Sequence, residues 1–165
     1  MIENLKFILG RYDHYIESVQ SKSNLYITLN TFILTGAVTL FAGFKNDLNL
    51  FLLNFLILVI IVSVVCMIYI LIAVNPQTKK SVEDSIIFFG NVANKNDDGE
   101  YWKIVKNMSD KEFRKDLANQ VQQVAIIVHK KHCRLKTASC LLILQFVLIG
   151  FWIVIFILKT KNNLI

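Results

Sequence analysis

Four residues of this 165-residue sequence combine the two kinds of side chain that hold a small phosphorylated ligand. Arginine binds phosphate oxygens through paired hydrogen bonds, and an aromatic ring offers a face on which a planar base can stack. Arg114 and Lys115 supply positive charge, and Phe88 and Phe89 supply adjacent rings. These four residues are therefore our candidates for a ligand-binding site.

A second group of basic residues has a different interpretation. Lys130, Lys131, Arg134 and Lys136, named here the anchor cluster, come directly before the last apolar block of the sequence. Anionic lipid attracts basic residues that lie beside a membrane span. We expect the anchor cluster to hold the chain at a membrane surface. Nucleic acid is a poor candidate partner, because the basic residues are few and lie beside the bilayer.

No pattern typical of catalysis occurs in the sequence. There is no phosphate-binding glycine loop, no nucleophile elbow and no catalytic triad pattern, so we expect no enzyme activity and no catalytic residues. His129 and Cys133 stand one helical turn apart, as metal ligands sometimes do. No carboxylate lies close to them in the sequence, so we expect no metal and no cofactor.

The composition and its distribution predict an integral membrane protein. Hydrophobic residues make up 55% of the chain and gather in three blocks, at 25–44, 50–74 and 137–158. A bilayer core about 30 Å thick needs roughly 20 apolar residues in a helix that crosses it. The fold class that we expect is all-α, with three transmembrane helices, of which the first two form a hairpin.

Two of these spans are predicted to continue into the cytoplasm as amphipathic helices. Residues 1–24 carry apolar side chains at helical spacing and run into the first span without a proline. In the segment 75–136, Ser109 and Glu112 have the spacing of a capping box, which predicts a helix from about 110 that continues into the third span. We expect the two amphipathic stretches to pack against each other.

The distribution of lysine and arginine predicts the orientation. Lys79 and Lys80 follow the second span and the anchor cluster precedes the third, whereas the link between the first two spans has only Lys45. Basic residues concentrate on the cytoplasmic side of membrane proteins. We therefore expect a multi-pass protein of the bacterial inner membrane, with its N-terminus and residues 76–136 in the cytoplasm.

One face of the first span carries small residues at every fourth position: Thr31, Thr35, Thr39 and Gly43. Small residues at this spacing let two helix backbones approach closely in lipid. Two interpretations stay open. This face packs against the second or third span, or it is the face through which the protein forms a homo-oligomer.

Several strings around the spans resemble one known family. They are Tyr12-Asp13-x-x-Ile16 with Ser21-Lys22-Ser23-Asn24; Ser85 to Ala93; Met108-Ser109-Asp110; Asp116-Leu117-x-x-Gln120; and Lys131 with Leu135-Lys136-x-Ala138. Their order and placement resemble the small transmembrane effectors of Pycsar, a bacterial antiphage system built around a pyrimidine cyclase. The family commonly has an aspartate two residues before the first of these lysines, where this sequence has Gln20.

The resemblance implies an antiviral defence function. A neighbouring cyclase would make cyclic CMP or cyclic UMP on infection, and the effector would respond to that activating ligand by impairing the inner membrane, causing abortive infection. The partners implied are the lipid bilayer, the cyclase through its product, and further copies of the chain. Two alternatives stay open: an effector of a related cyclic-oligonucleotide system, or a non-toxic membrane scaffold.

Overall fold

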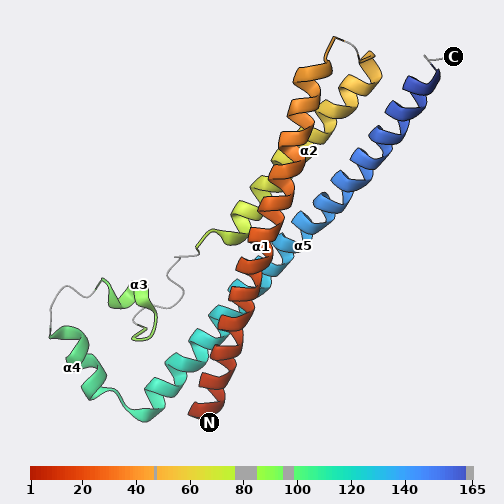
Figure 1. Ribbon diagram of the computed structural model, residues 1–165. Helices are drawn as coiled ribbons and strands as arrows, with labels where there is room; N and C mark the ends of the chain where they lie inside the picture. The colour runs from red at the N-terminus through yellow and green to blue at the C-terminus, as the bar shows by residue number, and fades with distance from the viewer. Residues whose placement is uncertain (47, 77–84, 95–98, 163–165) are drawn as a thin grey trace. The chain divides into compact units, whose positions relative to one another are not determined.

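The computed structural model describes residues 1–46, 48–76, 85–94 and 99–162, and Figure 1 shows the course of the chain. The side chains of Phe89, Glu100, Lys161 and Asn162 lie outside this description. The helices are α1 (Ile2–Phe44), α2 (Leu50–Val74), α3 (Phe89–Val92), α4 (Glu100–Asn107) and α5 (Asp110–Asn162). No strand occurs among the described residues, and the fold class is all-α, as predicted.

Three of these helices, α1, α2 and α5, are long and apolar enough to cross a membrane. This finding confirms the predicted number of spans and indicates a multi-pass membrane protein. The helices expose many large apolar side chains, among them Phe32, Ile61, Leu71, Phe146 and Val147. Hydrocarbon can solvate such side chains, and a helix satisfies its own backbone groups, so this surface suits a bilayer.

The ends and continuity of the long helices follow local signals in the sequence. α1 joins the N-terminal amphipathic stretch to the first span as one helix, and α5 joins the second amphipathic stretch to the third span. α2 has the bounds of the predicted second span. Its first turn is capped by Asn49, whose side-chain oxygen accepts a hydrogen bond from the N–H of Leu52 at 3.0 Å.

The chain forms two compact units. The polar unit consists of Met1–Ser18 and Asn75–Lys130, and the span unit consists of Val19–Val74 and Lys131–Ile165. The polar unit contains residues 1–18 of the first amphipathic stretch and residues 110–130 of the second, whereas 19–24 and 131–136 belong to the span unit. Lys79 and Lys80 lie outside the described residues.

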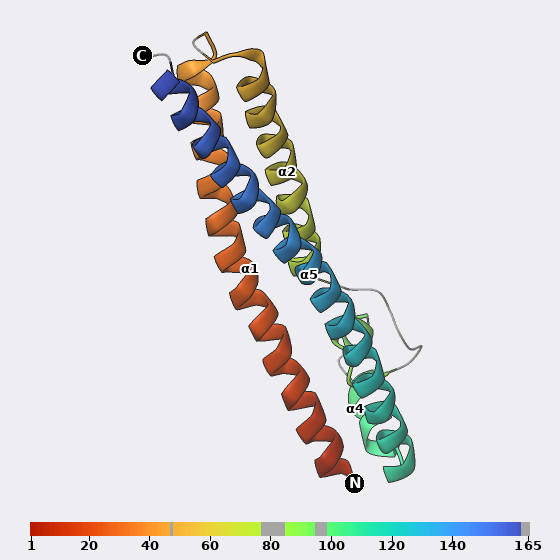
Figure 2. The ribbon, with the colours of Figure 1, turned by 90° about the vertical axis from the view of Figure 1, so that its right-hand side faces the viewer.

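In the span unit, α1, α2 and α5 lie side by side (Figure 2), and buried side chains line the seams between them. Buried residues recur at intervals of three and four residues, or of seven where one position is skipped. They are Val19, Ser23, Asn30, Ile33 and Ala37 on α1; Leu52, Leu56, Val59, Ser63, Cys66, Ile70 and Ala73 on α2; and Lys131, Leu135, Ala138, Leu142, Gln145 and Trp152 on α5. This mean spacing of 3.5 residues is typical of left-handed, coiled-coil-like packing.

The small-residue face of the first span does not take part in this packing. Thr31, Thr35, Thr39 and Gly43 are exposed, and a Cβ added at Gly43 would have no neighbour within 4 Å. The interpretation that this face packs against the second or third span is therefore wrong. Each residue turns a helix by about 100°, so with Asn30 in the seam Thr31 lies outside it.

Hydrogen bonds from side chains to backbone carbonyls join α5 to α2 at several levels. Gln145 Nε2 donates to the carbonyl oxygen of Val62 at 3.4 Å, and Cys66 Sγ donates to the carbonyl oxygen of Ala138 at 3.5 Å. In hydrocarbon, such polar contacts between helices fix the register of packing that apolar side chains leave free to slide. α5 and α2 are thus held in one antiparallel register.

Candidate ligand-binding surface

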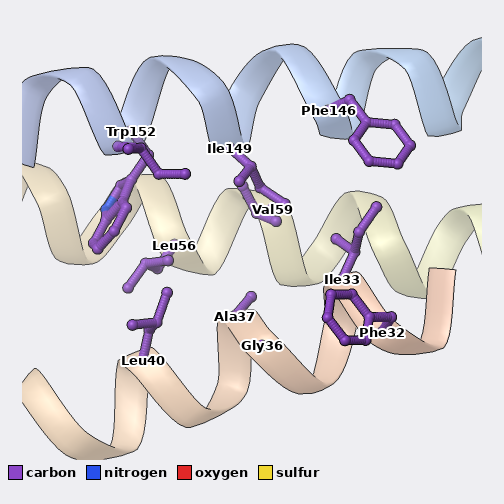
Figure 3. Close-up of a pocket in the computed structure, with 11 residues that line it drawn as sticks. Phe32, Ile33, Gly36, Ala37, Leu40, Leu56, Val59, Phe146, Ile149 and Trp152 are labelled. Carbon is purple, nitrogen blue, oxygen red and sulfur yellow. The ribbon is translucent and has the colours of Figure 1, made fainter. Parts of the chain in front are cut away.

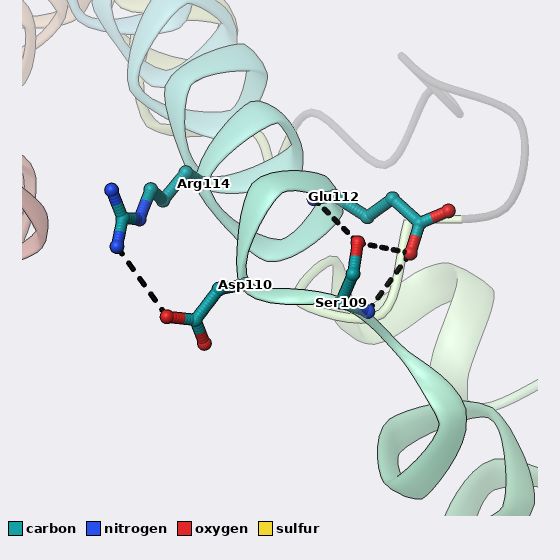
Figure 4. Close-up of polar contacts among 4 residues, drawn as sticks. All are labelled: Ser109, Asp110, Glu112 and Arg114. Atoms are coloured by element: carbon teal, nitrogen blue, oxygen red, sulfur yellow. Dashed lines mark hydrogen bonds and ion pairs between the residues drawn. The ribbon is translucent and has the colours of Figure 1, made fainter.

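The first turn of α5 is built by the predicted capping box. Glu112 Oε2 accepts hydrogen bonds from the backbone N–H and the hydroxyl of Ser109, at 2.9 and 2.6 Å, and Ser109 Oγ lies 3.3 Å from the N of Glu112. These hydrogen bonds from Ser109 lower the pKa of the Glu112 carboxyl. Figure 4 shows that Glu112 and Arg114 project from opposite sides of this helix start.

Arg114 and Lys115 line a surface depression together with Met1, Asp110 and Lys111. Arg114 NH2 lies 3.4 Å from Asp110 Oδ2, an exposed pair of the kind that contributes little to stability (Figure 4). The Arg114 Nε is buried and has no hydrogen-bond partner. With three basic side chains against one carboxylate, the side chains that line this depression carry a net positive charge.

Phe88 belongs to a segment that docks elsewhere on α5. Asp116 Oδ2 accepts hydrogen bonds from Ser85 Oγ at 3.1 Å and from the N–H of Ile86 at 3.0 Å. Gln120 Nε2 donates to Ser85 Oγ at 2.8 Å, and that oxygen also accepts from the N–H of Phe88 at 3.1 Å. Ser85 thus ties the chain entering α3 to one face of α5.

The four candidate ligand residues do not form one pocket among the described residues. Arg114 and Asp116 are two positions apart, about 200° around a helix, so Arg114 faces away from the side that holds Phe88. The half-buried Phe88 ring covers Gly90, where an added Cβ would lie 2.7 Å from Phe88 Cε1. Phe89 begins α3, and its side chain lies outside the described residues.

Sequence reasoning did not single out Ser85, Asp116 and Gln120 as site residues, although they stand in strings that carried the family resemblance. Ser85 and Gln120 are 2% and 5% exposed, so both are core residues of the polar unit. Ser85 lies 31 residues before Asp116 and 35 residues before Gln120. Nothing in the sequence indicates that these side chains form hydrogen bonds with each other. Only the fold brings them together.

A second depression, on the N-terminal part of α1, pairs a guanidinium with aromatic rings. Phe7, Gly10, Arg11, His14 and Tyr15 line it. Arg11 Cζ lies 6.0 Å from the centre of the Tyr15 ring, and Arg11 NH2 donates to Tyr15 Oη at 3.1 Å. The spacing of Phe7, Arg11 and Tyr15, four residues each, is the sequence signal that would have found this face.

A family model described as the Pycsar effector protein domain matches residues 4–158, which include all three candidate spans. The chain belongs to the Pycsar effector family. A search of curated proteins and a search of solved structures each gave no match. The match supports an antiphage effector role for this Pycsar effector, and it includes Arg114, Lys115 and the Ser85 segment.

The anchor cluster of the Pycsar effector divides between two positions. Lys131 Nζ donates to the carbonyl oxygens of Ala73 at 2.8 Å and Val74 at 3.2 Å, and Arg134 NH1 donates to that of Ile72 at 3.1 Å. These carbonyls end α2, where cations are favourable. Burial, and then the charge of Arg134, lower the pKa of Lys131.

Lys130 and Lys136, by contrast, are exposed and remain candidates for contact with anionic lipid. His129 and Cys133, on the same stretch of the Pycsar effector, are exposed as well. In the part of the chain that the structure describes, no group of three or more His, Cys, Asp or Glu side chains could hold a metal ion.

Proposed function

We propose that this Pycsar effector responds to a cyclic pyrimidine nucleotide, cyclic CMP or cyclic UMP, made by a neighbouring cyclase, and then impairs the bacterial inner membrane. The observation that carries the proposal is the family match over residues 4–158. Action at the membrane is supported by the three helices that are long and apolar enough to cross it. The resulting loss of membrane integrity would stop growth of the infected cell before phage mature.

The basic depression is the part of the polar unit best suited to the phosphate of such a ligand. A cyclic nucleotide carries one phosphodiester charge, which Arg114 and Lys115 can neutralise. The Arg114 side chain is partly exposed, and a guanidinium forms strong charge-assisted hydrogen bonds with phosphate oxygens. A ligand drives a switch only when it binds two states with different affinity. Arg114 lies near the start of α5, the helix that also forms the third span.

In this proposal the chain acts as a responder and has no catalytic role. The polar unit lies in the cytoplasm, where the cyclase product accumulates, and Lys130 and Lys136 contact the inner leaflet. The exposed face of Thr31, Thr35, Thr39 and Gly43 supports self-association in the membrane, because small residues allow close helix approach.

Binding of the ligand is tested on purified protein in detergent by titration calorimetry with cyclic CMP and cyclic UMP, using cyclic AMP for comparison. We expect one pyrimidine nucleotide to bind and Arg114→Ala with Lys115→Ala to abolish binding. Lys103→Ala with Lys106→Ala removes the same charge from α4 and should bind as the natural sequence does. Loss of binding only in Arg11→Ala with Tyr15→Ala would move the site to the second depression.

The effect on the membrane is tested by inducing the effector with and without the neighbouring cyclase gene. Uptake of a membrane-impermeant dye should require both genes and should be lost in the Arg114→Ala, Lys115→Ala variant. Dye uptake that is independent of the cyclase would contradict the proposed response. No dye uptake with both genes present would contradict membrane impairment.

A further inference from the structure

A layer of three polar side chains crosses the middle of the span unit. Asn30 on α1, Ser63 on α2 and Gln145 on α5 are each 0% exposed. Asn30 Nδ2 donates to the carbonyl oxygen of Ser63 at 3.1 Å, and Gln145 Nε2 donates to that of the preceding residue, Val62, at 3.4 Å. The three side chains therefore converge on one turn of α2, the most apolar of the three helices.

This polar layer, Asn30, Ser63 and Gln145, is incompletely satisfied. Asn30 Oδ1, Ser63 Oγ and Gln145 Oε1 are buried and have no hydrogen-bond partner. An oxygen that is removed from water and left unpaired destabilises the fold, and the low dielectric of the interior makes the effect larger. Three such oxygens in one layer, two of them amide acceptors and one a hydroxyl that can both donate and accept, have no partner among the described protein groups.

An apolar cavity of about 220 Å³ lies directly beside the polar layer. Its walls include the residues one turn away from each polar side chain: Ile33 follows Asn30, Val59 precedes Ser63, and Ile149 follows Gln145. Figure 3 shows Phe32 of α1 and Phe146 of α5 facing each other across this space, with Gly36 and Ala37 leaving it unfilled. Side chains that line an unfilled space lack contacts that would otherwise hold the helices together.

We infer that the polar layer binds water inside the span unit and is the level at which water crosses the bilayer once the helices separate. The inference deepens the proposed membrane impairment and depends on it. Water fits because it donates two hydrogen bonds to neutral oxygens, and buried waters typically bridge two to four polar groups. A cation fits poorly, since the layer holds no carboxylate to compensate a charge in hydrocarbon.

We expect α1 to be the helix that moves, because it forms fewer hydrogen bonds with α2 than α5 does. α5 is bonded to α2 through Trp152, Gln145 and the carbonyl of Ala138, and again through Lys131 and Arg134 at its end. In the described part of the span unit, α1 has one such bond, from Asn30. Departure of α1 breaks that bond and uncovers the polar faces of Ser63 and Gln145.

Cys66 is a native reporter for water at this level. It is 0% exposed and stands one turn after Ser63 on the same seam of α2. The other two cysteines, Cys133 and Cys140, are exposed. In a Cys133→Ser, Cys140→Ala background, a charged methanethiosulfonate reagent can label only Cys66, and only when water reaches the polar layer.

The experiment uses this background in liposomes loaded with carboxyfluorescein, with cyclic CMP or cyclic UMP as the trigger. We expect no labelling before the trigger and at least tenfold faster labelling of Cys66 when dye escapes. Dye escape with Cys66 still unlabelled overturns the inference and leaves membrane impairment standing. No dye escape from the background protein overturns membrane impairment, and the inference falls with it.

Matched variants separate the polar layer from general effects on folding. Asn30→Leu combined with Ser63→Ala and Gln145→Leu removes the orphan oxygens, so the variant should stay folded in detergent but release at least tenfold less dye. Asn54→Leu changes an asparagine that α2 exposes, and it should release dye normally. A folded triple variant that binds the nucleotide and releases dye at the natural rate overturns the inference.

Discussion

The indole N–H of Trp152 on α5 donates a hydrogen bond to the backbone carbonyl oxygen of Leu52 on α2, at 3.1 Å. Both side chains are buried in the core of the span unit. The Trp152 ring also stacks on Phe156, with ring centres 5.1 Å apart and planes 7° from parallel. One end of α5 is therefore fixed against the first turn of α2 by a directional contact as well as by apolar packing.

Trp152→Phe keeps an aromatic ring at this position and removes the N–H. We expect the free energy of unfolding to fall by about 1 kcal/mol, the size of an interhelical hydrogen bond in a membrane protein. Thermal unfolding in detergent measures the change. Phe151→Leu, at an exposed neighbouring position, is the control and should leave the midpoint unaltered. Equal losses in the two variants would show that the N–H contributes nothing.

Lys131→Met removes the cation that binds the last carbonyls of α2, while Lys130→Met removes an exposed neighbour of equal charge. The first change should destabilise the protein by about 2 kcal/mol, the range for hydrogen bonds to charged groups, and the second by much less. Unfolding in mixed micelles at neutral pH distinguishes them. Similar effects from both would mean that Lys131 acts only through its charge beside lipid.

The lowered pKa of Lys131 also predicts a dependence on pH. Because the folded state binds this proton less tightly than the unfolded chain does, stability rises with pH between the lowered pKa and the ordinary value near 10.5. Below the lowered pKa this contribution is constant. This rise of the free energy of unfolding with pH should be absent from Lys131→Met and unchanged in Lys130→Met. Unfolding at a series of alkaline pH values measures it.

Ser109→Ala removes the hydrogen bonds from the hydroxyl to Glu112. The pKa of the Glu112 carboxyl should return toward its ordinary value of 4.5, which NMR of the labelled side chain can follow. In the natural sequence this contribution to stability is complete above that value and is lost as pH falls through the lowered pKa. Amide exchange at the first turn of α5 should therefore accelerate in acid, and an unchanged Glu112 titration in Ser109→Ala would refute the cap as its cause.

Asp116→Ala removes the acceptor that holds Ser85 and Ile86 against α5. The segment 85–94 should become more than tenfold more sensitive to limited proteolysis, since two of the hydrogen bonds that hold it on α5 are lost. Asp110→Ala, which breaks only the exposed pair with Arg114, should leave the cleavage rate as it is. Cleavage that is equally slow in both variants would place the docking energy in apolar contacts instead.

Local signals account for the parts of the fold that were predicted from sequence. The length and composition of residues 50–74 are sufficient to specify α2, because a membrane span is selected by apolar length. Ser109 and Glu112 are three residues apart and interact within one turn, so the cap needs no tertiary information. The absence of proline before the first span similarly predicted the continuous helix α1.

The interior of the span unit was not predicted, because its contacts depend on the rotation of each helix. Thr31 and Asn30 are neighbours in sequence, yet one is exposed and the other is fully buried. The fourfold spacing of small residues marks a face that lies outside the seam, whereas the mixed spacing of three and four describes the seam itself. Lys131 and Lys130 likewise look equivalent in sequence, and only the end of α2 distinguishes them.

The bonds that Asn30, Gln145 and Trp152 donate all end on backbone oxygens of α2. Substitution of a side chain leaves the backbone carbonyl oxygen in place. One aliphatic residue can therefore replace another at Leu52 or Val62 of α2 without loss of the hydrogen-bond acceptor. The three donors have no such freedom. A saturation mutagenesis survey scored by phage survival would consequently record tolerance of aliphatic exchange at Leu52 and Val62 of α2 and narrow tolerance at Asn30, Gln145 and Trp152.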